Sequence, residues 1–220
     1  MTARIAVLIS GRGRNLEAIA AACADGRIDG RIVRVLSSRA DAGGLVFAQS
    51  LGLPTTVIES KAFADRSAYD TALSAQLHED APDIIVLAGF MRILTPAFVV
   101  QWLGRMLNIH PSLLPRHPGL QTHLRALEAG DREHGATVHF VTADLDGGPC
   151  IIQGQLNVRA EDTADTLADR VMRDIELKIL PQALAWLARG ELVLRDGVVL
   201  FRGRPLITPL GPAAMDEAFL

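Results

Sequence analysis

Apolar residues in the first half of the chain fall into short continuous runs, and the segments between the runs carry apolar residues at helical spacing. A short unbroken apolar run is typical of a strand that is buried on both faces of a sheet. The predicted strands cover residues 5–9, 32–36, 55–58, 84–88 and 106–110. The predicted helices cover residues 16–23, 40–50 and 66–79, and a further helix begins at Thr95-Pro96, where a cap residue precedes a proline of the first turn.

Strands that alternate with helices predict a parallel sheet with right-handed crossover connections. The fold class that we expect is therefore α/β, with a Rossmann-like, mostly parallel sheet flanked by helices. Ligands of such sheets bind beyond the carboxyl ends of the strands. The loops that matter are then GRGRN after the first strand, GFMRIL after the fourth and HPSLLP after the fifth.

After residue 120 the pattern changes and predicts a mixed C-terminal half. A short helix at 123–129 precedes two strands at 137–141 and 151–158, which we expect to pair, and a long helix follows at 163–188. Asp196-Gly197 between two apolar runs predicts a terminal β-hairpin. Because no linker separates the parts, we expect a single domain over residues 1–220, divided into a phosphate-binding parallel half (1–110), a second half that completes the site (111–190), and a hairpin and tail (191–220).

Composition and charge favour a soluble protein that acts on small molecules. The chain has 220 residues, 49% of them hydrophobic and 21% charged, with a formal net charge of -3. This charge gives no reason to expect nucleic acid or a membrane surface as a partner. No apolar run approaches the roughly 20 residues that span a bilayer, and the N-terminus lacks the pattern of a signal peptide. Cys23 and Cys150 form no metal or redox motif, which favours a reducing cytoplasm.

Two polar residues interrupt the apolar strand at 106–110. Asn108 and His110 stand two apart and therefore project from the same face of the strand. An amide and an exchangeable imidazole together can donate hydrogen bonds to a developing oxyanion. A carboxylate that orients the imidazole would complete such a site, and the stretch TADLDGGP offers Asp144 and Asp146. The alternative is structural, with capped polar residues on a strand end and an ordinary turn between two strands.

The segment SGRGRN at residues 10–15 follows the first strand and opens a helix, so its backbone amides can bind an anion. It is not a Walker loop, and it lacks the third glycine of a dinucleotide-binding loop. His110, His117 and His123 have no zinc-ligand spacing, and no nucleophile elbow is present. We therefore expect phosphate binding, no metal and no covalent nucleophile.

Five blocks of the sequence resemble the phosphoribosylglycinamide formyltransferase family, which uses a folate in purine biosynthesis. The blocks are VLISGRGRNL from Val7, LAGFMRIL from Leu87, LNIHPSLLP from Leu107, HGATVHFV from His134 and LDGGP from Leu145. They occur in the family's order, and the match runs from about residue 4 to 190. The Asn-x-His and Asp-Gly-Gly elements are shared by the wider 10-formyltetrahydrofolate transferase and hydrolase superfamily, whereas the first two blocks point to this member.

The resemblance implies a catalytic trio and two substrate sites, with 10-formyltetrahydrofolate as co-substrate and no metal. The implied catalytic residues are Asn108, His110 and Asp146. The implied ribonucleotide-binding residues are Gly13, Arg14, Asn15, Arg173 and Glu176. The implied folate-binding residues lie partly in the folate-site half, 111–190, and partly before it. They are Arg66, Met91, Arg92, Ile93, Leu94, Asn108, Val141, Thr142, Ala143, Asp144, Leu145 and Asp146. Arg14 departs from the family's Gly-Ser-Asn, and Arg173 and Glu176 are expected on one helix face.

The expected reaction is transfer of the formyl group to the amine of 5'-phosphoribosylglycinamide through a tetrahedral oxyanion. The expected partners are small molecules only, and the expected active form is a monomer or weak homodimer. A formyltetrahydrofolate hydrolase and another amine formyltransferase, such as a tRNA-formylating enzyme, are the alternatives within the superfamily. Both would be expected to carry a further domain, for which this chain is too short. A catalytically silent nucleotide-binding module is the alternative outside enzymes, and the presence of Asn108, His110 and Asp146 argues against it.

Overall fold

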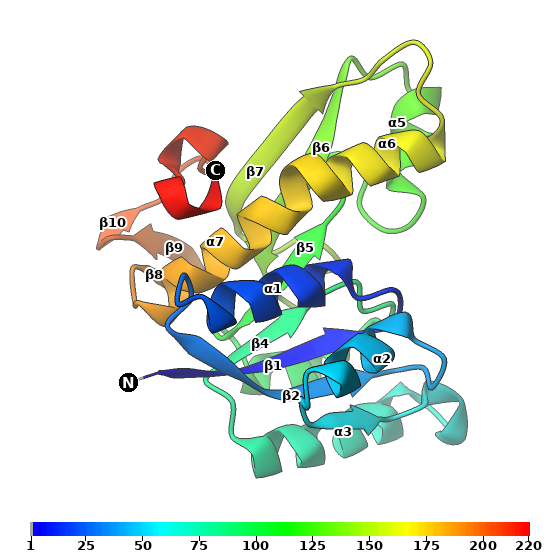
Figure 1. Cartoon of the computed structure of the whole chain (residues 1–220), viewed down its shortest axis with the longest axis vertical. Coiled ribbons are helices and arrows are strands. Elements are labelled where there is room, and N and C mark those ends of the chain that lie inside the picture. Colours follow the sequence, from blue (N-terminus) through cyan, green and yellow to red (C-terminus); the bar gives the residue numbers. More distant parts are fainter. Residues whose placement is uncertain (1) are drawn as a thin grey trace.

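The computed structural model describes residues 2–220, and its centre is a seven-stranded sheet in the order β3-β2-β1-β4-β5-β6-β7 (Figure 1). The strands are β1 (Ala3–Ile9), β2 (Gly30–Ser37), β3 (Thr55–Val57), β4 (Ile84–Leu87), β5 (Met106–His110), β6 (Glu133–Phe140) and β7 (Cys150–Asn157). Strands β1 to β5 pair in parallel, whereas β6 pairs antiparallel with both β5 and β7. The predicted Rossmann-like sheet with a mixed second half is confirmed.

The strand order reverses at β1, which lies between β2 and β4. A loop that follows a strand on one side of such a reversal diverges from the loop on the other side and leaves a crevice between them. The loops after β1, β4 and β5 all leave the sheet at its carboxyl edge, as the parallel pairing requires. The fold therefore brings the three predicted loops to one side of the molecule.

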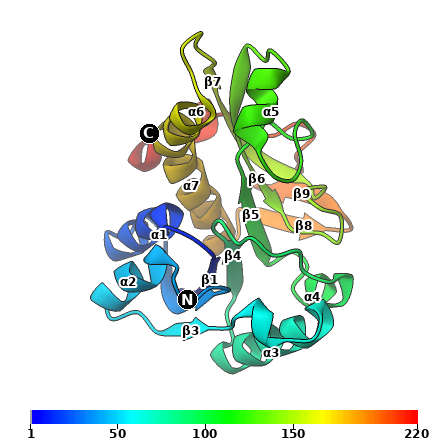
Figure 2. The same cartoon turned by 90° about the vertical axis from the view of Figure 1, so that its right-hand side faces the viewer.

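Helices cover both faces of the sheet (Figure 2). They are α1 (Arg14–Ala24), α2 (Gly43–Ser50), α3 (Arg66–Asp80), α4 (Pro96–Gln101), α5 (Thr122–Glu128), α6 (Ala164–Val171) and α7 (Leu177–Ala188). One core cluster joins the sheet to α1, α2, α6 and α7, and a second joins it to α3 and α4. Thr95 caps α4 and Pro96 follows in its first turn, as the sequence predicts.

The predicted long helix at 163–188 is continuous but not uniform. A π-helical turn, Met172–Glu176, separates α6 from α7. A π turn winds the chain more loosely than an α turn and is frequent at functional sites. A capping box between Thr163 and Thr166 fixes the start of α6. The α7 half packs against α1, so the last long helix lies beside the first one.

Two element boundaries differ from the predicted ones for identifiable reasons. Helix α2 begins at Gly43 and not at residue 40, because the Gly44 amide donates to the Gly11 carbonyl and the chain before it turns. Strand β6 begins at Glu133 and not at residue 137, because it pairs with β7 along its whole length. The close approach of these strands requires glycine, since a Cβ at Gly135 would lie 1.9 Å from the Gly154 oxygen.

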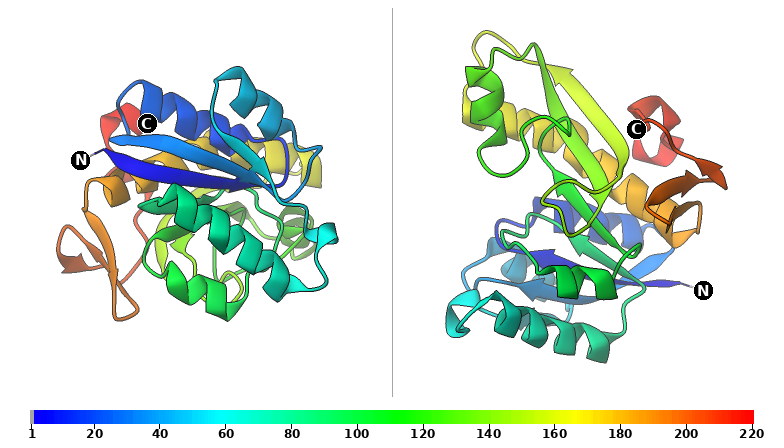
Figure 3. Two further views of the ribbon diagram at one scale, coloured as in Figure 1. Left: turned by 90° about the horizontal axis from the view of Figure 1, so that it is seen from below. Right: turned by 180° about the vertical axis from the view of Figure 1, so that it is seen from behind.

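The terminal hairpin is present and gains a third strand. Strands β8 (Leu192–Arg195), β9 (Val198–Phe201) and β10 (Arg204–Pro205) form a separate antiparallel sheet. Both turn residues, Asp196 and Gly197, have a positive φ, as a tight hairpin turn requires. This sheet and the C-terminal segment lie on the same side of the molecule as the start of β1, away from the carboxyl edge of the parallel strands (Figure 3). Within residues 2–220, no helix is both long enough and apolar enough to cross a membrane.

Candidate active site

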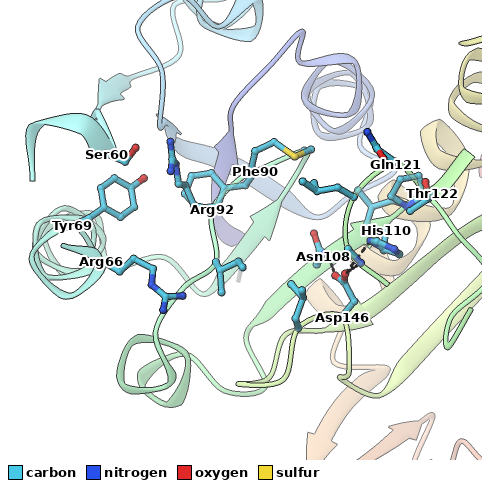
Figure 4. A pocket seen from close by; sticks show the side chains of 18 of the residues that line it. Ser60, Arg66, Tyr69, Phe90, Arg92, Asn108, His110, Gln121, Thr122 and Asp146 are labelled. Atoms are coloured by element: carbon cyan, nitrogen blue, oxygen red, sulfur yellow. Dashed lines mark hydrogen bonds and ion pairs between the residues drawn. The ribbon is translucent and has the colours of Figure 1, made fainter. Parts of the chain in front are cut away.

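A cavity of about 860 Å³ opens at the carboxyl edge of the sheet. Its walls come from the loop after β4, the end of β5, the start of α5, the loop after β6 and the start of α3. Asn108, His110 and Asp146 lie together at one end, and Arg66 and Tyr69 of α3 lie at the other (Figure 4). The cavity is therefore elongated, with a polar cluster at its inner end and a cationic side chain at its far end.

The polar cluster begins on β5, which places Asn108 and His110 on one face of the strand as predicted. Leu107 and Ile109 alternate with them and join the apolar core. His110 is only 5% exposed. Burial of a polar ring at the end of an apolar strand is costly unless its nitrogen atoms have partners. The contacts of His110 therefore indicate which ring nitrogen carries the hydrogen.

Both ring nitrogen atoms of His110 face oxygen atoms. Nε2 lies 2.9 Å from the backbone carbonyl oxygen of His117. Because a carbonyl oxygen only accepts hydrogen bonds, Nε2 carries the hydrogen in this contact. Nδ1 lies 3.4 Å from Oδ2 of Asp146, farther than a good hydrogen bond. Nδ1 is thus the ring atom that is free to exchange a proton or to donate to a bound oxygen.

Asp146 is held by the backbone of the loop that follows β5. The Gly119 amide donates to Oδ2 of Asp146 at 2.8 Å, and the Asn108 amide nitrogen lies 3.5 Å from Oδ1. Asp146 has a φ of 50°, which Asp and Asn tolerate better than most residues. The turn that follows explains the Asp-Gly-Gly motif, since a Cβ at Gly148 would lie 1.8 Å from the Phe140 oxygen. The structure thus brings together the three residues of the predicted trio.

His139 of β6 also belongs to this cluster, and sequence reasoning missed it. It is the cross-strand partner of Asn108. Its Nδ1 donates to the Phe140 carbonyl oxygen at 2.9 Å, so its Nε2 is left as the acceptor for the Asn108 amide at 3.0 Å. Burial lowers the pKa of His139, which keeps the ring neutral and able to accept. The available signal was the alternation of Thr137 and His139 along β6, but the register between β5 and β6 is needed to place His139 beside Asn108.

The phosphate-loop residues converge with Glu176. Gly13 has a φ of 86°, and its backbone touches that of Gly44 so closely that an added Cβ would lie 2.5 Å from the Gly44 Cα. The Asn15 amide donates to Oε2 of Glu176 at 2.8 Å, and both side chains are buried. Burial raises the pKa of Glu176. Oδ1 of Asn15 is also buried, and no group in the described part of the chain donates to it.

The two arginines of the predicted ribonucleotide site behave differently from Asn15 and Glu176. Arg14 forms an ion pair with Asp169 of α6 at 3.0 Å. Arg173 pairs with its neighbour Asp174, and its side chain is 65% exposed. The expectation that Arg173 and Glu176 share a helix face is wrong, because both lie in the π turn, whose wider winding separates residues three apart. Only Glu176 turns inward.

The predicted folate residues line the other walls. Ser10 Oγ accepts from the Met91 amide at 2.8 Å and bonds Ser38 Oγ at 2.6 Å, which fixes the start of the loop GFMRIL. Asp70 accepts from the Thr95 amide at 2.7 Å and fixes its end. The exposed apolar residues at the mouth are Met91, Ile93, Leu120 and Leu145.

Leu94 has a different place from Met91 and Ile93. It is 7% exposed and joins the core beneath the loop. A smaller cavity of about 90 Å³ reaches inward from the loop, with Arg92, Ile93 and Leu94 on one wall. Its opposite wall is formed by Val141, Thr142, Ala143, Asp144, Leu145 and Asp146. Over the described residues 2–220, no group of three or more His, Cys, Asp or Glu side chains is arranged to hold a metal ion.

Comparisons with known proteins agree with this geometry. The formyl transferase family model matches residues 3–184. The phosphoribosylglycinamide formyltransferase of Escherichia coli K12 is 49% identical over 97% of this chain and 99% of its own length. The corresponding protein of Haemophilus influenzae is 44% identical over 92% and 95% of the two chains. The structure of phosphoribosylglycinamide formyltransferase from Coxiella burnetii, in complex with CHES, superposes with a TM-score of 0.91 at 45% identity, over 96% of this chain and 99% of that one. The chain therefore belongs to the formyl transferases and, among them, to the phosphoribosylglycinamide formyltransferase family.

Proposed function

We propose that the chain transfers the formyl group of 10-formyltetrahydrofolate to the amine of 5'-phosphoribosylglycinamide. The observation that carries the proposal is the cluster of Asn108, His110 and Asp146 at one end of the cavity, whose walls include the loop GFMRIL. Family membership over nearly the whole chain supports the same reaction. A relative from Bos taurus is named a trifunctional purine biosynthetic protein, which supports a place for the reaction in purine biosynthesis.

The reaction begins when the neutral amine attacks the formyl carbon. A carbon–nitrogen bond forms, the formyl oxygen becomes an oxyanion, and the attacking nitrogen becomes positively charged. Asn108 can turn toward the oxyanion the amide hydrogen that faces Oδ1 of Asp146 at 3.5 Å, and protonated His110 can donate from Nδ1. Preorganised donors of this kind stabilise an oxyanion strongly because they need no rearrangement during the reaction.

The tetrahedral intermediate then collapses. Asp146, next to Nδ1, takes the proton from the attacking nitrogen and passes it toward the folate nitrogen, whose bond to the formyl carbon breaks. The carbonyl re-forms on the new amide, and His110 recovers its original hydrogen bonds. Every proton and electron pair is accounted for by the two substrates and these side chains.

The two substrates approach the cluster from opposite sides. The phosphate is proposed to bind the backbone amides of Gly13 to Asn15 at the N-terminus of α1, with Glu176 beside the ribose or glycinamide part. The folate ring is proposed to lie between residues 91–94 and 141–146, with Arg66 at the far end of the cavity receiving its glutamate. Arg66 lies at the end of the cavity opposite the trio, which suits a long co-substrate (Figure 4).

We propose a monomer or weak homodimer as the active form. We also propose a cytoplasmic location, which the free thiols of Cys23 and Cys150 support.

Incubation with both substrates, followed by measurement of deformylated folate and formylated ribonucleotide, tests the proposed function. Equal amounts of the two products are expected. Folate deformylation that proceeds without the amine substrate would favour a hydrolase. Absence of turnover together with binding of the ribonucleotide would favour a silent nucleotide-binding module and would refute the proposal.

A further inference from the structure

The loop between β5 and α5, residues 111–121, reaches the catalytic cluster through its backbone. The His117 carbonyl oxygen accepts from Nε2 of His110, and the Gly119 amide donates to Oδ2 of Asp146. These two backbone groups therefore contact both the proposed oxyanion donor, His110, and the proposed proton carrier, Asp146. A small shift of this backbone would therefore change the orientation of His110 and Asp146 together.

The side chain of His117 contacts Asp131, which does not belong to the cluster, and this contact holds the backbone of the loop. Its Nε2 lies 2.7 Å from Oδ2 of Asp131, which stands between α5 and β6. The two side chains are 14% and 7% exposed, so the contact is largely shielded from water. Arg116 pairs with the other oxygen of Asp131, but its side chain is 51% exposed.

The backbone conformation of His117 also indicates that contacts hold this residue in place. Its φ is 52°, a left-handed conformation that is uncommon outside glycine, although His adopts it more often than most residues, and it persists where contacts hold it. The first part of the loop is fixed independently, because Ser112 and Leu114 bond to Thr137 and Leu114 bonds to Gln153. Farther along, Arg125 donates to the Pro118 carbonyl oxygen. The His117–Asp131 contact is the one that acts on the residue bonded to His110.

We propose that His117 and Asp131 are positioning residues for the catalytic pair, acting through the His117 carbonyl and the Gly119 amide. The inference rests on the proposed function for its kinetic consequence. The His117 carbonyl keeps the hydrogen of neutral His110 on Nε2 and leaves Nδ1 open toward Asp146 and the substrate. When the carbonyl is released, the neutral ring can take the other tautomer and the protonated ring can rotate, and in both cases Nδ1 no longer faces Asp146 and the substrate.

A matched pair of substitutions separates this role from general support of the loop. In His117→Gln, the amide nitrogen of glutamine reaches about as far as Nε2 and can still donate to Asp131. In His117→Leu, the size is similar but the donor is lost. Loss of alignment by about 1 Å can cost about 100-fold in rate, so we expect His117→Leu to lower kcat about 10- to 100-fold, with both KM values changed less than about 3-fold. His117→Gln should keep most of the activity, and Asp131→Asn should fall between the two.

The pattern of effects decides the outcome. If the loop serves only to close the mouth of the cavity, His117→Leu will raise the folate KM and keep kcat at saturating folate, which overturns the proposal. Equal loss in His117→Gln and His117→Leu also overturns it, because the donor would not matter. If His117→Leu does not fold, His117→Asn replaces it, since asparagine tolerates the backbone conformation but its amide is too short to reach Asp131.

A spectroscopic measurement keeps the inference independent of the proposed reaction. Nitrogen-15 NMR of histidine rings at alkaline pH distinguishes the two neutral tautomers, and the His110 signals are assigned by their loss in His110→Ala. We expect the Nε2–H tautomer in the unsubstituted protein and a mixture in His117→Leu. An unchanged tautomer in His117→Leu would overturn the positioning role, even if the protein proved to catalyse a different reaction.

Discussion

The substitution Asp146→Asn tests the proposed chemistry with little disturbance of the structure. Asparagine has the same shape, and it favours the left-handed backbone that residue 146 adopts with a φ of 50°. Its side-chain oxygen can still accept from the Gly119 amide, as Oδ2 of Asp146 does at 2.8 Å. The change therefore removes the negative charge and the ability to take a proton and leaves the fold in place.

The magnitude follows from the position of the charge. Oδ2 of Asp146 lies 3.4 Å from Nδ1 of His110, where attraction to a protonated ring is about 5 kcal/mol at an effective dielectric constant of about 20. A general acid–base group typically contributes about 10²–10⁴-fold to the rate, equivalent to about 3–5 kcal/mol. The two figures agree, so we expect kcat to fall by about 10²–10⁴-fold. Substrate binding should change little, because the phosphate loop and the far end of the cavity are untouched.

Steady-state kinetics with each substrate varied in turn provides the measurement. The control is Asp144→Asn, which removes a charge from an exposed side chain of the same loop. Any effect of Asp144→Asn should appear in the folate KM and not in kcat. Wild-type kcat in a folded Asp146→Asn variant would refute the proton-transfer role, and so would a loss that disappears at saturating folate.

Three further substitutions or conditions test the remaining parts of the structure. Burial raises the pKa of Glu176, so the folded state holds this proton more tightly than the unfolded state, and ionisation of Glu176 lowers stability as pH rises through the raised pKa. The variant Glu176→Gln should therefore melt at a higher temperature than wild type at neutral pH and at the same temperature in acid. Its ribonucleotide KM should be raised. Asp169→Asn frees Arg14 from its ion pair and should lower the ribonucleotide KM at low ionic strength but not at high salt; no change at either salt concentration would show that Arg14 does not contact the phosphate. Burial lowers the pKa of His123 and His134 to about 4, so the folded state resists their protonation and the melting temperature should fall as pH drops from about 6.5 toward 4; a flat profile over that range would contradict the assigned burial.

The architecture was predictable because burial on both faces demands continuous apolar runs. Strand β5 begins and ends where the run of Met106 to His110 predicts. The cap at Thr95 and the turn at Asp196-Gly197 were equally predictable, because their side chains and backbone preferences act locally. These features depend on neighbouring residues in the chain, so the sequence pattern contains the information that fixes them.

Parts of the site were not predictable for the opposite reason. The π turn at Met172–Glu176 follows the same local apolar pattern as an α-helix, so Arg173 and Glu176 were placed on one face. His139 acquires its place beside Asn108 from the register of β5 against β6, which no local pattern specifies. The contacts of the His117 carbonyl and the Gly119 amide come from backbone atoms, which every residue has, so residue identity does not reveal them.

The hydrogen bond between Asn15 and Glu176 joins residues that are 161 positions apart. During synthesis, the phosphate loop and α1 leave the ribosome long before Glu176 does, so the side-chain amide of Asn15 has no hydrogen-bond partner until Glu176 has been made. Closing so long a loop costs conformational entropy before the contact forms, and such non-local contacts slow folding. We therefore expect the ribonucleotide corner to be among the last parts to assemble and among the first to open. Protection of the Asn15 and Glu176 backbone amides from hydrogen exchange should rise when the ribonucleotide binds, since the ligand stabilises the closed form.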